Sequence, residues 1–263
     1  MIEPTLNTTI EGSVATLTLS RPAKLNAFTA ALHAELRAAL DAMERDGRVR
    51  VVVVTGEGRA FSSGQDLTEA LPRGQDGRVD LAVPLARDYN PLALRLLAYP
   101  KVTIAALNGP AVGAAANLAL ACDIVLAARS ATLQQAFSRI ALIPDAGGTW
   151  LLPRIVGHKR ALALALTGES VGAEEALAMG LVHRVFDDDA FRAETAAFAA
   201  SLAAGPSGAY RLIKQAFARS GTNDLPAQLA LEAELQGQAG RSNDFAEAVA
   251  AFREKRTPVF GGR

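Results

Sequence analysis

Hydrophobic and polar positions alternate between residues 10 and 19, on either side of Glu11-Gly12, as is typical of strands with one covered face. Two largely apolar runs follow, at residues 51–55 and 102–107. Both are predicted to be buried strands, and the β-branched run at 51–55 is typical of a sheet covered on both faces. The pattern therefore predicts an α/β core in which helices cover the sheet.

A helix is predicted between the first two of these regions. Thr29 can cap its amino terminus. His33 lies off the apolar stripe of this helix and is expected to be exposed. The stripe consists of four residues that recur at intervals of four, four and three: Leu32, Leu36, Leu40 and Met43.

The stretch 102–122 contains no formal charge over 21 residues, a length that could span a membrane. Asn108, Gly109 and Pro110 interrupt it, and such residues break a helix and leave polar groups unpaired in hydrocarbon. We therefore expect a buried strand, a tight turn and a buried helix that starts near Gly113, and no membrane span.

The start of that helix leaves unpaired backbone amides, and the small residues there let a ligand approach closely. The Ala114 amide could stabilise an oxygen that becomes negative during a reaction, although small residues can also serve only for close packing. The Gly-rich segment 56–67 matches neither the dinucleotide fingerprint nor the serine-hydrolase elbow. Its turn could nevertheless present the amide of Gln65 as a second donor, and the two donors would form an oxyanion hole.

Two further regions differ from the core. Residues 68–91 are polar, rich in Gly and Pro and without periodicity, which predicts a mobile surface segment or a lid. After about residue 200 only helices are predicted, and the last places Phe245, Val249 and Phe252 on one face. We therefore divide the chain into a core at 1–200 and a helical region at 201–263.

Composition narrows the possible functions. The 263 residues are 50% hydrophobic, with 27 basic and 27 acidic side chains, so neither a nucleic-acid surface nor a basic membrane patch is expected. A small-molecule substrate is the default. The single cysteine, Cys122, excludes an internal disulfide, and with three scattered histidines it makes a transition-metal site improbable. No secretory signal is recognised, and we expect a cytoplasmic protein.

Four motifs, in order and spacing, resemble the crotonase (enoyl-CoA hydratase/isomerase) superfamily: 61–67 (FSSGQDL), 108–113 (NGPAVG), 121–124 (ACDI) and 143–149 (IPDAGGT). The resemblance extends over nearly the whole chain. It implies a spiral of ββα units with a C-terminal helical trimerisation region, and a homotrimer or a dimer of trimers. It also implies a coenzyme A thioester as substrate, no separate cofactor, and an oxyanion hole formed by the amides of Gln65 and Ala114. The residues implied to contact coenzyme A are Lys24, Leu25, Ser62, Ser63, Asp66 and Leu67.

The hydratases of this superfamily carry two glutamates, and the matching positions here are Asn117 and Phe137. Neither side chain can act as a base, and together with Trp150 they are expected to line the acyl pocket. The remaining carboxylate is Asp145, which stands where hydratases have glycine. It could be the acid/base of the reaction or only the cap of the following helix.

Apolar neighbours of Asp145, if close in space, would raise its pKa towards a value useful for proton transfer. These neighbours are Leu142, Ile143 and Trp150.

A lone base facing an oxyanion hole predicts an isomerase. The motifs resemble the 1,2-epoxyphenylacetyl-CoA isomerase family of aerobic phenylacetate degradation, which converts a ring epoxide to an oxepin and shifts Δ3 double bonds to Δ2. Two alternatives remain open at this point. One is an enoyl-CoA hydratase, and the other is a non-catalytic scaffold that binds CoA thioesters.

Overall fold

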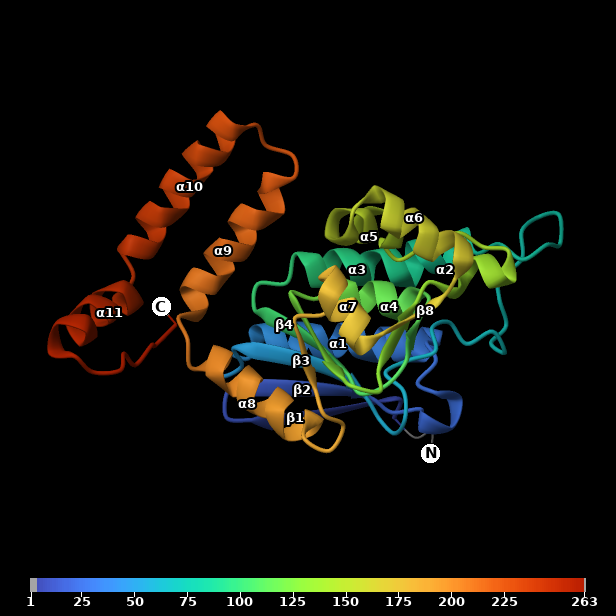
Figure 1. Cartoon of the computed structure of the whole chain (residues 1–263), viewed down its shortest axis with the longest axis horizontal. Coiled ribbons are helices and arrows are strands. Elements are labelled where there is room, and N and C mark those ends of the chain that lie inside the picture. Colours follow the sequence, from blue (N-terminus) through green and yellow to red (C-terminus); the bar gives the residue numbers. More distant parts are fainter. Residues whose placement is uncertain (1–3, 263) are drawn as a thin grey trace.

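A six-stranded sheet forms the centre of the molecule in the computed structural model, which describes residues 4–262 (Figure 1). Its first two strands are antiparallel, and every later pair of neighbours is parallel. The predicted α/β class is confirmed. In sheet order the strands are β1 (Leu6–Glu11), β2 (Val14–Leu19), β3 (Val51–Gly56), β4 (Val102–Leu107), β6 (Ile124–Ala128) and β9 (Arg184–Phe186).

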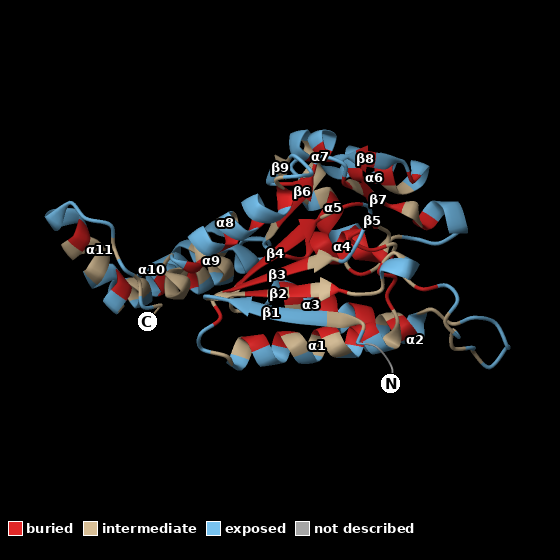
Figure 2. Cartoon of the chain, turned by 90° about the horizontal axis from the view of Figure 1, so that it is seen from below, coloured by how far each residue is buried: buried red, intermediate tan, exposed pale blue. Residues whose placement is uncertain are grey.

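The middle strands are covered on both faces, as their apolar runs predict. The first four residues of β3 and all six of β4 are buried, whereas β1 at the sheet edge is mostly exposed (Figure 2). Helix α8 (Phe191–Ala203) packs across β2, β3, β4 and β6, and α1 (Ala30–Arg45) packs on β1 and β2. These helices remove the apolar side chains of the sheet from water, which is the main favourable contribution to folding.

A smaller sheet of three short strands was not predicted from the sequence. It contains β5 (Ala111–Val112), β7 (Thr132–Gln134) and β8 (Ser170–Gly172) in that order. The helices around it are α4 (Ala114–Leu120), α5 (Gly148–Val156), α6 (His158–Thr167) and α7 (Ala173–Met179), and 3₁₀ turns occupy Pro22–Lys24 and Ala136–Ile140. Among the described residues, no helix is long and apolar enough to cross a bilayer.

Helix α1 begins as predicted, because Thr29 Oγ1 accepts a hydrogen bond from the Leu32 amide at 3.2 Å. The prediction that His33 is exposed is wrong, since the imidazole is only 1% exposed. The rings of Phe28 and Tyr89 lie with their centroids 4.9 and 4.3 Å from it. Burial lowers the pKa of His33 to about 4, so the ring is neutral at pH 7.

The segment 68–91 is only partly the irregular surface that was predicted. It holds turns and one bridge between Arg73 and Val79, but becomes helical from α2 (Ala82–Pro84) onwards. One turn of π-helix follows (Leu85–Tyr89) and leads directly into α3 (Asn90–Leu97), with Tyr89 buried. The irregular part of this segment is therefore residues 68–81, and a role as a lid stays a prediction.

Three helices form an arm that projects from the core after α8 (Figure 1). They are α9 (Ser207–Ser220), α10 (Leu225–Gly240) and α11 (Asn243–Glu254). Lys214 anchors the arm, because its ammonium group donates to Asp123 Oδ2 at 2.6 Å and to the Lys101 carbonyl at 2.9 Å. The division of the chain at residue 200 stays a prediction.

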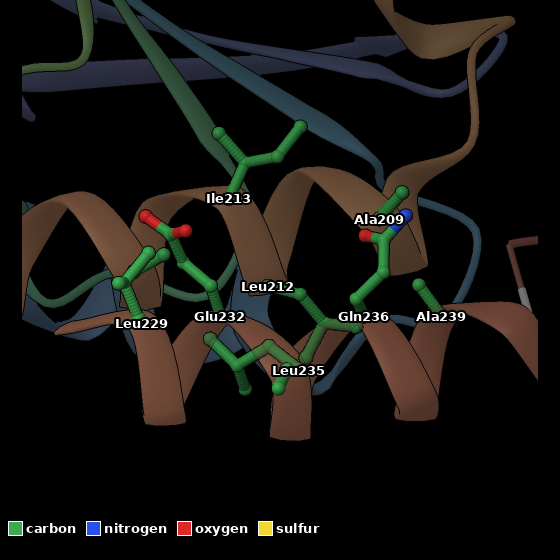
Figure 3. Close-up of a pocket in the computed structure, with 10 residues that line it drawn as sticks. Ala209, Leu212, Ile213, Leu229, Glu232, Leu235, Gln236 and Ala239 are labelled. Carbon is green, nitrogen blue, oxygen red and sulfur yellow. The ribbon is translucent and has the colours of Figure 1, made fainter. Parts of the chain in front are cut away.

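A cavity of about 550 Å³ lies between α9 and α10, and Figure 3 shows its mostly apolar lining. Ile213 and Leu229 in this lining are about half exposed. On α11, Phe245 and Phe252 are 54% and 85% exposed. In the isolated chain, the arm therefore exposes apolar side chains at the molecular surface.

The last residues of the chain return to the core and form what we call the C-terminal clasp, residues 258–262. Asp244 in α11 accepts hydrogen bonds from the amides of Gly261 and Gly262 at 2.7 and 2.9 Å. The Arg50 guanidinium, next to the start of β3, donates to the carbonyls of Phe260 and Ala203 at 3.0 and 3.2 Å. The clasp thus connects the arm to the sheet.

Candidate active site

Three loops meet at one edge of the six-stranded sheet. They follow β2, β3 and β4, and because these strands are parallel, their carboxyl ends lie side by side. The Phe61 and Ser62 amides donate to the Pro110 carbonyl at 3.1 and 3.2 Å, and the Val112 amide donates to the Ser62 carbonyl at 3.0 Å. The second and third loops are therefore fixed to one another by main-chain hydrogen bonds.

The residues predicted to contact coenzyme A come from the first two of these loops, which are also joined. The Ser63 amide donates to the Leu25 carbonyl at 2.9 Å, and the Ser63 hydroxyl lies 3.5 Å from the Lys24 carbonyl. Lys24 and Leu67 are exposed and could contact a ligand. The structure brings all these residues together, while their contact with coenzyme A stays a prediction.

Two members of this set are already engaged within the protein. The buried Ser62 hydroxyl donates to the Asn26 carbonyl at 2.8 Å. Asp66 accepts from the Thr68 hydroxyl at 2.6 Å and from Arg21 at 2.9 Å, and these contacts lower the pKa of Asp66 to about 2. Both side chains hold the loops in shape, so any ligand contact of theirs must coexist with these hydrogen bonds.

The two amides predicted to form the oxyanion hole are brought close to one another. Gly64, which precedes Gln65, has φ +89°, and a Cβ atom there would lie 2.8 Å from the Val112 carbonyl oxygen and 3.9 Å from the Ala114 nitrogen. Only glycine permits this approach. Within residues 4–262 neither the Gln65 nor the Ala114 amide meets a hydrogen-bond acceptor. Two donors without a partner thus lie near one another, and their service as an oxyanion hole stays a prediction.

Tyr89 also contacts this loop, although no pattern in the sequence indicates it. Its hydroxyl donates to Gln65 Oε1 at 2.7 Å, and its ring packs edge-on against His33. Burial raises the pKa of Tyr89 far above its usual range, and the negative charge of Asp145 adds to that effect. Tyr89 therefore connects the loop that carries Gln65 with the buried imidazole of His33.

Asp145 does not cap the helix that follows it, and that alternative is wrong. The N-cap of α5 is Gly147, and no side chain satisfies the first amides of that helix. Among the described residues, buried Asp145 Oδ1 has no hydrogen-bond partner, and burial raises the pKa of Asp145 from 3.8 to about 6. A carboxyl group with such a pKa can both accept and donate a proton near neutral pH.

Apolar neighbours were expected to cause this rise in the pKa of Asp145. The three candidates are all partly exposed to solvent: Leu142 is 38% exposed, Ile143 78% and Trp150 50%. The Arg154 guanidinium lies 3.9 Å from the centroid of the Trp150 ring. A place for Trp150 in the acyl pocket stays a prediction.

Asn117 and Phe137, at the positions of the hydratase glutamates, are both buried. Asn117 Nδ2 donates to the Asp145 carbonyl at 2.8 Å. A Cβ on Gly113 would lie 3.7 Å from the Phe137 ring, so that ring faces the turn before Ala114. Neither residue supplies a base, and contact of either with an acyl group stays a prediction.

The described part of the chain contains no group of three or more His, Cys, Asp or Glu side chains that could hold a metal ion. Cys122 is buried, and burial raises the pKa of its thiol to about 12, which makes it a poor nucleophile. Asp145 and the two free amides are therefore the groups at this site that can act on a bound carbonyl compound.

The chain is similar to known proteins over nearly its whole length. A family model described as Enoyl-CoA hydratase/isomerase matches residues 9–263. A probable enoyl-CoA hydratase of Rhodobacter capsulatus is 50% identical over 259 residues, with 98% of each chain covered. The 1,2-epoxyphenylacetyl-CoA isomerase of Escherichia coli is 46% identical over 254 residues, with 97% of each chain covered. The crystal structure of an enoyl-CoA hydratase from Bacillus anthracis is 33% identical with a TM-score of 0.91, over 98% of this chain and all of that one.

Proposed function

Because the chain belongs to the enoyl-CoA hydratase/isomerase (crotonase) family, we propose that it isomerises coenzyme A thioesters by relocating a proton along the acyl group. The observation that carries this proposal is the state of Asp145. Its carboxyl group is largely buried, one of its oxygens has no partner within the described chain, and its pKa is about 6. Such a group is suited to removing a proton and returning it.

The chemistry can be written for a 3-enoyl thioester. The amides of Gln65 and Ala114 donate to the thioester oxygen, which makes the protons on C2 more acidic. The Asp145 carboxylate removes one of these protons, and the electron pair moves through the enolate to the C3–C4 double bond. Asp145 then returns the proton to C4, leaving the double bond between C2 and C3. The step balances with the substrate, one carboxyl group and two amides.

The finer assignment is an aromatic substrate, in which a 1,2-epoxyphenylacetyl thioester is converted to the oxepin. It is supported by the 46% identity to the isomerase of that name, with Δ3 to Δ2 isomerisation as an accompanying activity. The competing assignment, enoyl-CoA hydration, is supported by the 50% identity to a probable hydratase. The amide of Asn117 and the ring of Phe137 stand against it, because the two hydratase carboxylates would have to occupy these positions.

Two further parts of the proposal concern binding and assembly. We propose that the coenzyme A moiety lies along the first two loops of the site. The arm is proposed to pack against other copies of the chain in a trimer or dimer of trimers, which would cover its exposed apolar residues. The residues proposed to contact coenzyme A are Lys24, Leu25, Ser62, Ser63, Asp66 and Leu67.

Asp145→Asn tests the proposal, because it preserves the shape of the side chain and removes the base. We expect kcat for conversion of a 3-enoyl-CoA to the 2-enoyl-CoA to fall by about 10²- to 10⁴-fold, the usual contribution of a positioned general base. Exchange of the α-proton in heavy water should fall in parallel. The matched control is Asp189→Asn, which changes an exposed carboxylate distant in sequence from the site and should leave both rates unchanged.

Two results would overturn the assignment. Wild-type isomerisation and exchange rates in Asp145→Asn would show that this carboxylate is not the base, and unchanged turnover of every substrate would favour a binding role for the site. Hydration of crotonyl-CoA faster than any isomerisation would instead favour the hydratase. A panel that includes the aromatic epoxide thioester and 3-enoyl chains identifies the preferred acyl group.

A further inference from the structure

Asn117 is buried completely, and both ends of its amide group are hydrogen bonded. Its Nδ2 donates to the main-chain carbonyl of Asp145 at 2.8 Å, and its Oδ1 accepts from Gln135 Nε2 at 2.8 Å. The same carbonyl of Asp145 accepts a second hydrogen bond from the Gly148 amide at 2.7 Å. Gln135, which is also buried, thus contacts the oxygen end of the Asn117 amide, and the acceptor-only carbonyl of Asp145 requires the nitrogen end.

We propose that Asn117 is a positioning residue, which with Gln135 sets the place of the Asp145 carboxyl group relative to the oxyanion amides. This inference rests on the proposed function, in which Asp145 is the base. Asn117 lies three residues after Ala114 on the short helix α4, about one turn away. One rigid element therefore presents one oxyanion donor and also holds the loop that carries the base.

The contact requires a hydrogen-bond donor at position 117. The atom facing the Asp145 carbonyl must be a donor, and an ionised carboxylate has only acceptors. A glutamate or aspartate at this position would place two acceptors against each other in a buried place, which is unfavourable. An ionised carboxylate at 117 would therefore lose the hydrogen bond that holds the Asp145 loop in its present position.

The surroundings of Gly148 show how closely Asn117 packs against this loop. A Cβ atom at position 148 would lie 2.2 Å from Asn117 Nδ2 and 2.6 Å from its Cγ. Real Cβ atoms do not approach other atoms so closely, so any residue other than glycine at 148 would displace the side chain of Asn117. The Asn117 amide therefore occupies the space left by the missing side chain of Gly148, the first residue of α5.

The main test measures kcat and KM for 3-enoyl-CoA isomerisation in Asn117→Ala and Gln135→Leu. Displacement of a reacting group by about 1 Å can cost around 10²-fold in rate. We expect Asn117→Ala to lower kcat by about 10- to 100-fold, with KM changed less than about threefold. Gln135→Leu should give a smaller loss. The matched control is Gln134→Leu, since the adjacent Gln134 side chain bonds the Gly168 carbonyl at 2.8 Å and should not affect kcat.

Combined variants separate positioning from a general loss of stability. If Gln135 acts through Asn117, then adding Gln135→Leu to Asn117→Ala should cause no further loss of kcat, whereas independent roles would give multiplied losses and overturn the proposal. Adding Asn117→Ala to Asp145→Asn should also cause no further loss. A wild-type kcat in Asn117→Ala, with Asp145→Asn inactive, would refute the positioning role and leave the proposed function standing. A wild-type kcat in Asp145→Asn would refute the proposed function itself.

Gly148→Ala provides a measurement that does not depend on Asn117→Ala folding well. Alone it should lower both the melting temperature and kcat, because the new methyl group collides with Asn117. Adding Asn117→Ala makes room for that methyl group, so the melting temperature should rise again while kcat stays low. Recovery of kcat together with stability, or no loss of either in Gly148→Ala, would contradict the proposal.

Discussion

Replacing Asp145 by asparagine should change the pH dependence of stability in a direction opposite to the usual one for carboxylates. The pKa of Asp145 is about 6 in the folded protein, against 3.8 for an ordinary aspartate. The folded state therefore binds the proton more tightly than the unfolded state. The resulting stabilisation is fully present below about pH 4 and is lost as the pH rises through about 6.

The size of the effect follows from the same two pKa values. A difference of about two units corresponds to roughly 3 kcal/mol at 1.36 kcal/mol per unit. The carboxyl group keeps some contact with solvent, which reduces the effect to between about 1 and 3 kcal/mol at pH 8. Asparagine does not ionise, so Asp145→Asn should exceed the wild type in free energy of unfolding by this amount at pH 8. Near pH 4 the pH-dependent part of the difference should vanish.

Urea unfolding of both proteins at matched concentration, at each pH from 4 to 8, measures this difference. Contributions of other ionisable groups are common to both proteins and cancel in the subtraction. Any change in packing appears as an offset that does not depend on pH. A difference that stays constant across this range, or that grows towards low pH, would refute the conclusion that the carboxyl group is held in an unfavourable, buried place. The exposed control Asp189→Asn should show no such trend.

Two further predictions concern Tyr89 and the arm. Tyr89→Phe removes the 2.7 Å hydrogen bond to Gln65 and keeps the ring against His33. We expect kcat to fall about 5- to 10-fold, which corresponds to the loss of a hydrogen bond worth roughly 1 kcal/mol. An unchanged kcat in the isomerisation assay would show that the hydroxyl is not needed. Truncation after Gly240 removes α11 and the C-terminal clasp, and the shortened chain should run as a monomer or aggregate in light scattering. Retention of the full-length mass would contradict a role of this region in assembly.

The sequence predicts those elements whose burial pattern lies within one continuous segment. The strand at 102–107 and the helix after Gly113 were confirmed because a long uncharged run, broken by Asn108 and Pro110, leaves few other solutions. The Thr29 cap was confirmed for the same reason, since a cap and its helix are neighbours in the chain. Local chemistry was sufficient in each case.

The sequence-based predictions were wrong or missing where the surroundings of a residue are formed by segments distant in the chain. His33 lies off the stripe of its own helix, and its burial depends on Tyr89, 56 positions later in a segment that looks polar. The strands β5, β7 and β8 have only two or three residues each, too few for a periodic pattern. Their pairing depends on contacts between segments that are distant in the sequence.

At the site, the sequence identified Asp145 but left its role divided between base and cap. The structure decides against the cap because α5 begins three residues later, behind a left-handed Gly147. The hydrogen bond from Asn117 to Asp145 joins residues 28 positions apart, and no spacing rule predicts it. Asn117 was noted in the sequence only because it replaces a glutamate of the hydratases, and the structure shows that it makes a specific hydrogen bond.

The C-terminal clasp has a consequence for the order in which the protein matures. Its hydrogen bonds join Asp244 to the amides of Gly261 and Gly262, and Arg50 to the carbonyl of Phe260. The ribosome adds these residues after β1 to β9 and α8, which precede them in the chain and carry their own apolar core. The clasp cannot close before residues 258–262 have been synthesised. The arm therefore takes its final orientation on a sheet whose strands are already complete, and its apolar side chains are set in place only after every strand has left the ribosome.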